Sequence, residues 1–127
     1  MHRVLWALAA TAVLSLAGCS SYGSGSPSAP TKVMDGVLTN SVGMTLYTFD
    51  KDPAGGGKSE CNGPCAANWP PLLAATDAKA SGDYTIITRA DGARQWAYKG
   101  KPLYTFARDS AGAAPTGVSD NWPLAKK

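Results

Sequence analysis

The chain has 127 residues, with 12 lysines and arginines against 9 acidic residues and a formal net charge of +3. Its longest basic cluster is Lys126-Lys127, so it lacks the concentrated positive patch that binding of nucleic acid requires. The only histidine, His2, lies at the extreme N-terminus. A mature chain without it cannot build a Ser-His or Cys-His catalytic arrangement.

Residues 1–18 have the pattern of a signal peptide. Arg3 provides the positive start, and the uncharged apolar run 4–16 is too short to span a bilayer as a stable helix. The run leads into Leu16-Ala17-Gly18-Cys19, which resembles the lipobox of bacterial lipoproteins. This resemblance implies that Cys19 becomes the lipidated first residue; the alternative is an ordinary signal peptide with a chance cysteine at its cleavage site.

Residues 19–31 would then comprise the lipidated Cys19 and a flexible tether of Ser, Gly and Pro with a reach of roughly 20 Å. More than one acyl chain gives stable membrane attachment. Ser20, not an aspartate, follows the cysteine. In an organism with two membranes, the lipoprotein resemblance then implies location in the cell envelope, on the periplasmic face of the outer membrane.

Residues 32–127 leave room for one small domain, for which the sequence predicts an all-β fold of short antiparallel strands. Turn residues occur at 40–43, at Asp91-Gly92 and at 99–102. The expected strands between them are rich in β-branched and aromatic residues, and they cover 32–39, 44–49, 84–89, 95–98 and 103–106.

No segment shows a sustained helical period. The best helical candidate is the short region 61–69, which Pro70-Pro71 would stop. Residues 107–120 are rich in Gly, Ala, Ser and Pro and are expected to form a long surface loop.

An internal duplication organises this domain. The block Leu46-Tyr47-Thr48-Phe49 recurs as Leu103-Tyr104-Thr105-Phe106, and Asn68-Trp69-Pro70 recurs as Asn121-Trp122-Pro123. Matching blocks joined by segments of variable length indicate two copies of one unit, spanning about residues 37–72 and 94–125. The repeated side chains are Tyr47, Phe49, Asp52 and Trp69 in the first copy and Tyr104, Phe106, Asp109 and Trp122 in the second.

Tyrosine and phenylalanine at alternate strand positions point to one face, so the aromatic rings of both copies are expected to fill one shared interior. Asp52 and Asp109 come where each strand should end, where a carboxylate can accept backbone N–H groups and fix a turn. The alternative is a catalytic or metal-binding role for these residues together with Asp50. Repetition favours the scaffold role, because a catalytic site is seldom needed twice.

The repeated pattern Tyr-x-Phe-x-x-Asp resembles the bacterial secreted-repeat lipoproteins, which carry a repeated Y-x-[FWY]-x-x-D motif. The segments Cys61-Asn62-Gly63-Pro64-Cys65 and Trp69-Pro70-Pro71 are similar to the first repeat of that family. The second copy lacks the cysteine pair, so a disulfide could close a loop in only one of the two repeats. Because the family has no defined activity, the resemblance implies a location and an architecture but no reaction.

Cys61 and Cys65 remain once Cys19 is lipidated, and an even number of thiols in an extracytoplasmic protein indicates a disulfide. On the chain-entropy model, closing so short a loop stabilises the fold by about 2 kcal/mol. Two alternatives stay open. A redox-active pair needs a lowered thiol pKa, for which only Lys58 is near in sequence.

A metal site is the second alternative for the cysteine pair. It lacks a histidine ligand, and the soft side chains Met34 and Met44 lie in expected strands where packing explains them.

The sequence thus favours a non-catalytic, lipid-anchored cell-envelope protein that serves as a binding or structural module. Its expected partners are the membrane, reached through the lipid anchor, and an unidentified envelope protein. The alternative is an extracytoplasmic redox or metal-handling accessory that uses the Cys61/Cys65 pair. We expect neither a cofactor nor enzymatic activity, because the spacing of the aspartates selects no paired-carboxylate site.

Overall fold

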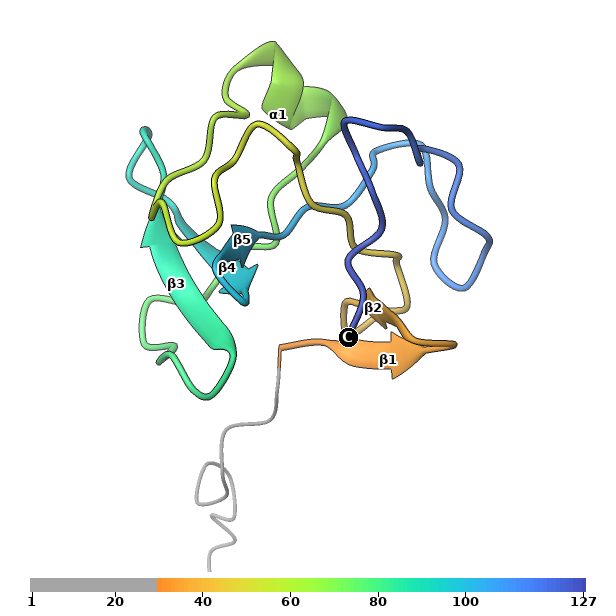
Figure 1. Ribbon diagram of the computed structural model, residues 1–127, viewed down its shortest axis with the longest axis horizontal. Coiled ribbons are helices and arrows are strands. Elements are labelled where there is room, and N and C mark those ends of the chain that lie inside the picture. Colours follow the sequence, from red (N-terminus) through yellow and green to blue (C-terminus); the bar gives the residue numbers. More distant parts are fainter. Residues whose placement is uncertain (1–29) are drawn as a thin grey trace, which may run out of the picture.

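Two small antiparallel sheets and the irregular segments between them make up residues 30–127, the part of the chain that the computed structural model describes (Figure 1). The signal peptide, Cys19 and nearly all of the tether lie outside the described residues, so the predictions made for them stay predictions. Within residues 30–127, no helix combines the length and the apolar character needed to cross a membrane.

The first sheet is a hairpin of β1 (Lys32–Met34) and β2 (Val37–Thr39). The prediction of one continuous strand over 32–39 is therefore wrong. The chain reverses at Asp35-Gly36, where both residues have positive φ, 53° and 78°. Asp-Gly is a favoured pair for such a two-residue hairpin turn, so the sequence did carry a signal for this reversal.

The second sheet has the order β3-β4-β5 and consists of β3 (Tyr84–Thr88), β4 (Arg94–Tyr98) and β5 (Lys101–Pro102). The strands predicted at 84–89 and 95–98 are confirmed to within one residue. The helical prediction reduces to the single turn α1 (Pro64–Asn68), which begins with a proline at its first position.

The predicted strands at 44–49 and 103–106 do not form regular ladders, and in this the prediction is wrong. Each of these segments makes single bridges, because its neighbour changes from one residue to the next. Tyr47 bridges to Tyr104 on one side and to Leu124 on the other, whereas Thr45 bridges to Thr39. These segments nevertheless run through the centre of the molecule, between the two sheets (Figure 1).

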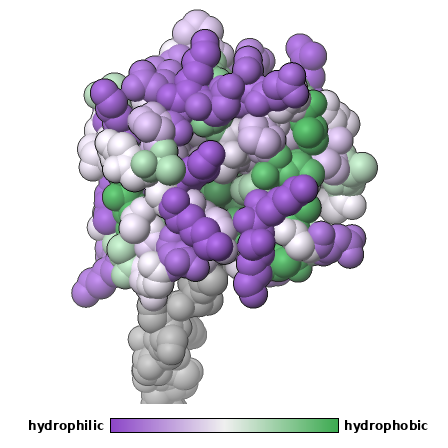
Figure 2. Space-filling view, viewed as in Figure 1, coloured by the Kyte–Doolittle hydropathy of each residue, from purple (hydrophilic) through white to green (hydrophobic). Residues whose placement is uncertain are grey.

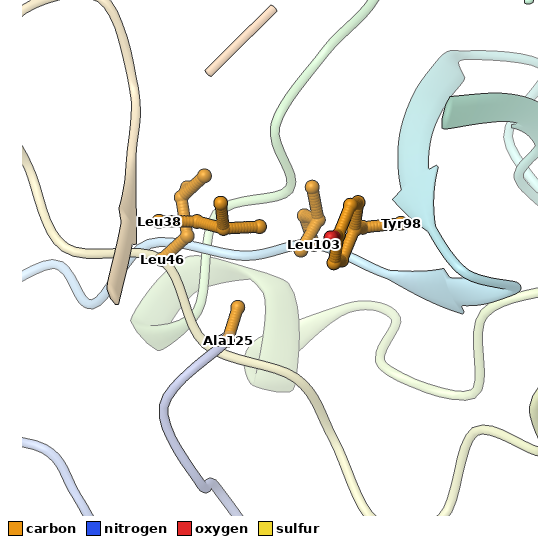
Figure 3. Packing of buried hydrophobic residues seen from close by; sticks show 5 residues of the cluster. All are labelled: Leu38, Leu46, Tyr98, Leu103 and Ala125. Carbon is orange, nitrogen blue, oxygen red and sulfur yellow. The ribbon is translucent and has the colours of Figure 1, made fainter. Parts of the chain in front are cut away.

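One hydrophobic cluster joins the two copies (Figure 3), and its buried members are Leu38, Leu46, Tyr98, Leu103 and Ala125. The equivalent leucines of the two copies, Leu46 and Leu103, are both fully buried there. The shared interior that the duplication predicts is therefore present, and both copies contribute to it.

The end of each repeat completes the sheet of the other. Near the C-terminus, the Ala125 amide donates to the Leu46 carbonyl (2.9 Å), and the Ala125 carbonyl accepts from the Leu38 amide (2.8 Å). The first repeat ends in the same way, because the Leu72 amide donates to the Leu103 carbonyl and the Leu72 carbonyl accepts from the Trp96 amide, both at 2.9 Å. Neither repeat thus has its full set of hydrogen bonds without the other.

Two glycine pairs join the repeats through backbone hydrogen bonds at equivalent positions. The Gly55 amide donates to the Gly100 carbonyl (2.8 Å), and the Gly112 amide donates to the Gly43 carbonyl (3.0 Å). Gly43 and Gly100 have φ of 91° and 83°, which strains any other residue. A Cβ at Gly100 would lie 2.6 Å from the Gly55 nitrogen, but a Cβ at Gly43 would lie 3.4 Å from the Gly112 nitrogen.

Gly100→Ala should therefore destabilise the protein more than Gly43→Ala. Both variants lose about 1–2 kcal/mol through positive φ, but only Gly100→Ala also forces the two backbones apart. Urea unfolding followed by tryptophan fluorescence measures both losses. Gly36→Ala is the matched control, because its φ is also positive (78°) and nothing lies within 4 Å of the added Cβ. Equal losses for all three variants would contradict the close approach.

Candidate functional site

Tyr47 and Tyr104 meet at the centre of the molecule. The amide of each donates to the carbonyl of the other, at 2.8 and 2.9 Å, and both side chains are fully buried. Their hydroxyl groups then cross over: Tyr47 donates to Asp109 (2.5 Å), and Tyr104 donates to Asp52. Each motif tyrosine is therefore paired with the motif aspartate of the other repeat.

The second oxygen of each aspartate holds the loop that follows it. Oδ1 of Asp52 accepts the Glu60 amide (2.7 Å), and Oδ1 of Asp109 accepts the Thr116 amide (2.9 Å) and the Thr116 hydroxyl (2.6 Å). The aspartates thus accept backbone N–H groups, from residues well beyond the adjacent turn. Within residues 30–127, no three His, Cys, Asp or Glu side chains lie together as metal ligands would.

Four of the repeated rings form one stack that alternates between the copies. Phe49 stacks on Trp122 (4.2 Å between centroids), Trp122 on Trp69 (3.9 Å) and Trp69 on Phe106 (4.4 Å, tilted). The two motif tyrosines meet this stack edge-on, Tyr47 against Trp69 and Tyr104 against Trp122, each at 5.1 Å. Such contacts stabilise a core beyond the area they bury.

A buried polar network surrounds Arg89 in the half of the domain that carries the disulfide, and no sequence motif indicates it. Its centre is Arg89, whose guanidinium donates to the Ser59 hydroxyl (3.0 Å), to the Gln95 side-chain oxygen (2.7 Å) and to the Cys61 carbonyl. Arg89 and Gln95 are buried, as is Ser59, whose hydroxyl also bonds to that of Tyr104 (2.5 Å).

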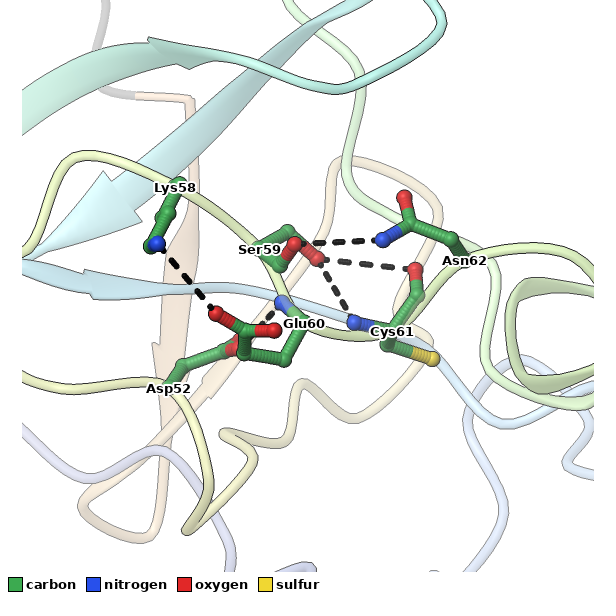
Figure 4. A network of polar contacts seen from close by, with 6 residues as sticks. All are labelled: Asp52, Lys58, Ser59, Glu60, Cys61 and Asn62. Carbon is green, nitrogen blue, oxygen red and sulfur yellow. Dashed lines mark hydrogen bonds and ion pairs between the residues drawn. The ribbon is translucent and has the colours of Figure 1, made fainter.

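Figure 4 shows the part of this network that lies in the chain from Asp52 to Asn62 and, beside it, the exposed Lys58–Glu60 ion pair. A lone arginine late in a strand gives no sequence signal of burial, because this side chain is normally exposed. No buried polar side-chain atom of the described residues lacks a hydrogen-bond partner, so the network is fully satisfied.

Burial changes the acidity of the crossed pairs. Desolvation, reinforced by the hydrogen bond to Asp109, raises the pKa of Tyr47 to about 12. Desolvation and the bond to Asp52 likewise raise the pKa of Tyr104. Burial also raises the pKa of Asp52, although the hydrogen bond from Tyr104 opposes this. The folded state therefore holds the Asp52 proton more tightly than the unfolded state, so protonated Asp52 adds to the free energy of unfolding at low pH. This added stability is lost as the pH rises through the pKa of Asp52 in the folded state.

Cys61 and Cys65 form a disulfide that links the loop after Asp52 to α1. Cys61 is fully buried in the same cluster as Phe49, Tyr104 and Trp122, whereas Cys65 is half-buried at its edge. Of the two cysteines only Cys65 has exposed surface, so an external thiol would have to approach from its side. The bond joins a buried loop to a helical turn, a position that fits a structural disulfide.

Comparison with known proteins gives one match. A family model described as a secreted repeat of unknown function matches the chain twice, over residues 31–73 and 85–126. Comparisons with curated proteins and with solved structures gave no match. The two matched stretches contain the crossed Tyr47–Asp109 and Tyr104–Asp52 pairs and the four stacked rings.

Removing one tyrosine hydroxyl should cost more at Tyr104 than at Tyr47. In Tyr104→Phe, the carboxylate of Asp52, which is 2% exposed, loses a hydrogen-bond donor where water cannot replace it. That loss should cost about 2–3 kcal/mol, against about 1 kcal/mol for Tyr47→Phe, because Asp109 is half-exposed and keeps Thr116. Chemical unfolding measures both. Tyr98→Phe serves as the control, and a larger loss at Tyr47 than at Tyr104 would contradict the assignment.

Removing the disulfide through the double variant Cys61→Ala, Cys65→Ala should lower the free energy of unfolding by about 2 kcal/mol. The fluorescence of the stacked tryptophans should stay native, because the stack does not depend on the bond. In a glutathione buffer the wild-type disulfide should stay oxidised. Rapid exchange with glutathione, at a potential close to that of the buffer, would instead support a redox role.

Proposed function

The chain belongs to a family of secreted repeats of unknown function, and on this premise we propose that it is a non-catalytic, lipid-anchored module of the cell envelope. In this role the duplicated domain is a rigid body that presents a surface, and the N-terminal segment holds it at the membrane.

The observation that carries this proposal is that the motif residues are engaged in hydrogen bonds within the fold. Both motif aspartates accept hydrogen bonds from a tyrosine of the other repeat and from a loop amide of their own. Side chains engaged in this way fix the fold and are not free to act on a substrate. The motif that defines the repeat is thus explained by stability alone, and it leaves surface recognition as the function.

The sequence around Cys19 supports the anchor. The small residues before this cysteine resemble a lipobox, and the Ser, Gly and Pro residues after it lead directly to β1. A chain attached there would hold the domain within roughly 20 Å of the bilayer. The alternative, a redox accessory built on the Cys61–Cys65 disulfide, has less support, because Lys58, the cation near it in sequence, pairs with Glu60 (3.8 Å).

Cys19→Ser should move the protein from the membrane fraction to the soluble fraction of cells that express the full chain. The physical reason is that acyl chains on this cysteine would be the membrane attachment. Mass spectrometry of the wild-type N-terminal peptide should show the added lipid.

The double variant Cys61→Ala, Cys65→Ala is the matched control for this experiment, because it also loses cysteines and should remain in the membrane fraction. A wild-type protein that is soluble and carries no lipid would contradict the anchor.

A further inference from the structure

The two halves of the domain differ in how the loop after the motif aspartate packs, although the duplication would make these loops alike. After each motif aspartate, a loop runs against the hairpin of the other repeat. In one half this is the loop 53–61, which closes on β3 and β4 through hydrogen bonds from Arg89 to Ser59 and to Cys61. The side chain of Gln95 fills the contact and is 0% exposed.

In the other half the loop also meets the first repeat, through the Gly112–Gly43 hydrogen bond, but the space beside Val37 is not filled. Val37 is the residue equivalent to Gln95 in this half. Each of the two forms a bridge to the end of a repeat, Val37 to Lys126 and Gln95 to Leu73. Yet Val37 is only half-buried, and a groove of about 350 Å³ lies beside it. The groove runs between the hairpin β1–β2 and the loop 112–115.

The lining of this groove is mainly apolar. Met34 and Val37 share one face of the hairpin, because they are paired across it, and Leu124 closes the other side. Leu124 also borders a neighbouring hollow of about 660 Å³, which Val118 lines as well. Met34, which lines the groove, is 53% exposed, and Val118, which lines the hollow, is 52% exposed, so both add to the apolar surface on this side.

The surface view agrees with this arrangement. In Figure 2, apolar residues gather on the right-hand side of the molecule, in the part of the view where β1, β2 and the loop 107–117 lie in Figure 1. Asp35 is the charged residue among those that line the groove, and Asp120 and Lys126 line the neighbouring hollow. No basic side chain lines the groove to bind an anion, so its apolar side chains supply the surface for recognition.

The position of the groove indicates its occupant. Met34 is the last residue of β1, and the described chain enters β1 within two residues of its start at residue 30. The chain therefore enters the domain beside β1, which lines the groove, and a lipid on Cys19 would keep the groove within the tether's reach of the bilayer. We propose that the groove formed by Met34, Val37, Leu124 and the loop 112–115 docks an acyl chain of the membrane lipid. This inference rests on the proposed lipid anchor.

Photo-crosslinking of the full chain tests the proposal. A diazirine-bearing amino acid replaces Met34 in one preparation and Leu73 in another, and the purified lipoprotein is irradiated in nanodiscs of phosphatidylethanolamine and phosphatidylglycerol. Leu73 is the control, because it is similarly exposed (59%, against 53% for Met34) and does not line the groove. Mass spectrometry should find lipid adducts at position 34 in several-fold higher yield than at position 73.

Equal yields at the two positions would overturn the proposal. So would a crosslink from position 34 to a protein, in place of lipid, in the intact cell envelope. If mass spectrometry finds no lipid on Cys19, the proposed anchor fails. The groove is then tested separately by adding the unlipidated chain to vesicles of the same lipids, where adducts at position 34 would still support acyl-chain docking and their absence would reject it.

Discussion

The hydrogen bond from Tyr104 to the buried carboxylate of Asp52, and its counterpart from Tyr47 to Asp109, are the constraint on which this fold depends. A carboxylate without partners in a core is very costly, and here the required donor comes from the other repeat. The same crossing governs the backbone and the ring stack, in which successive rings come from alternate repeats. The duplicated units are therefore two halves of one cooperative structure, and each lacks essential partners when it is alone.

Within this shared design, the two halves have diverged. After the Asp52–Glu60 hydrogen bond the chain continues with Cys61 and its disulfide, but after the equivalent Asp109–Thr116 bond it continues with Gly117. A Cβ at Gly117 would lie 2.7 Å from the Trp69 ring and 2.8 Å from the Phe106 ring, so no cysteine fits there. One half is clasped and closed around Arg89, and the other keeps an open groove. A scaffold of this kind can hold one side rigid and leave the opposite side for recognition.

The sequence predicted the duplication, the all-β class and the shared aromatic interior, because repeated blocks and alternating rings are local patterns. It could not predict that Tyr47 pairs with Asp109 and not with Asp52, since a tyrosine hydroxyl reaches either partner only once the three-dimensional path of the chain is known. The burial of Arg89 depends on Ser59 and Gln95, which come from distant segments. The irregular bridges of 44–49 and 103–106 likewise arise from the crossing of the repeats, which overrides the strand propensity of these residues.

The crossing itself can be measured with double-mutant cycles on the free energy of unfolding. We expect a coupling of about 1–3 kcal/mol between Tyr104→Phe and Asp52→Ala, which lie in different repeats, because the two single variants remove the same hydrogen bond. We expect almost no coupling between Tyr104→Phe and Asp109→Ala, although these residues belong to one repeat. A strong coupling within the repeat together with none across it would show that each unit closes on itself, and would contradict the interlocked structure.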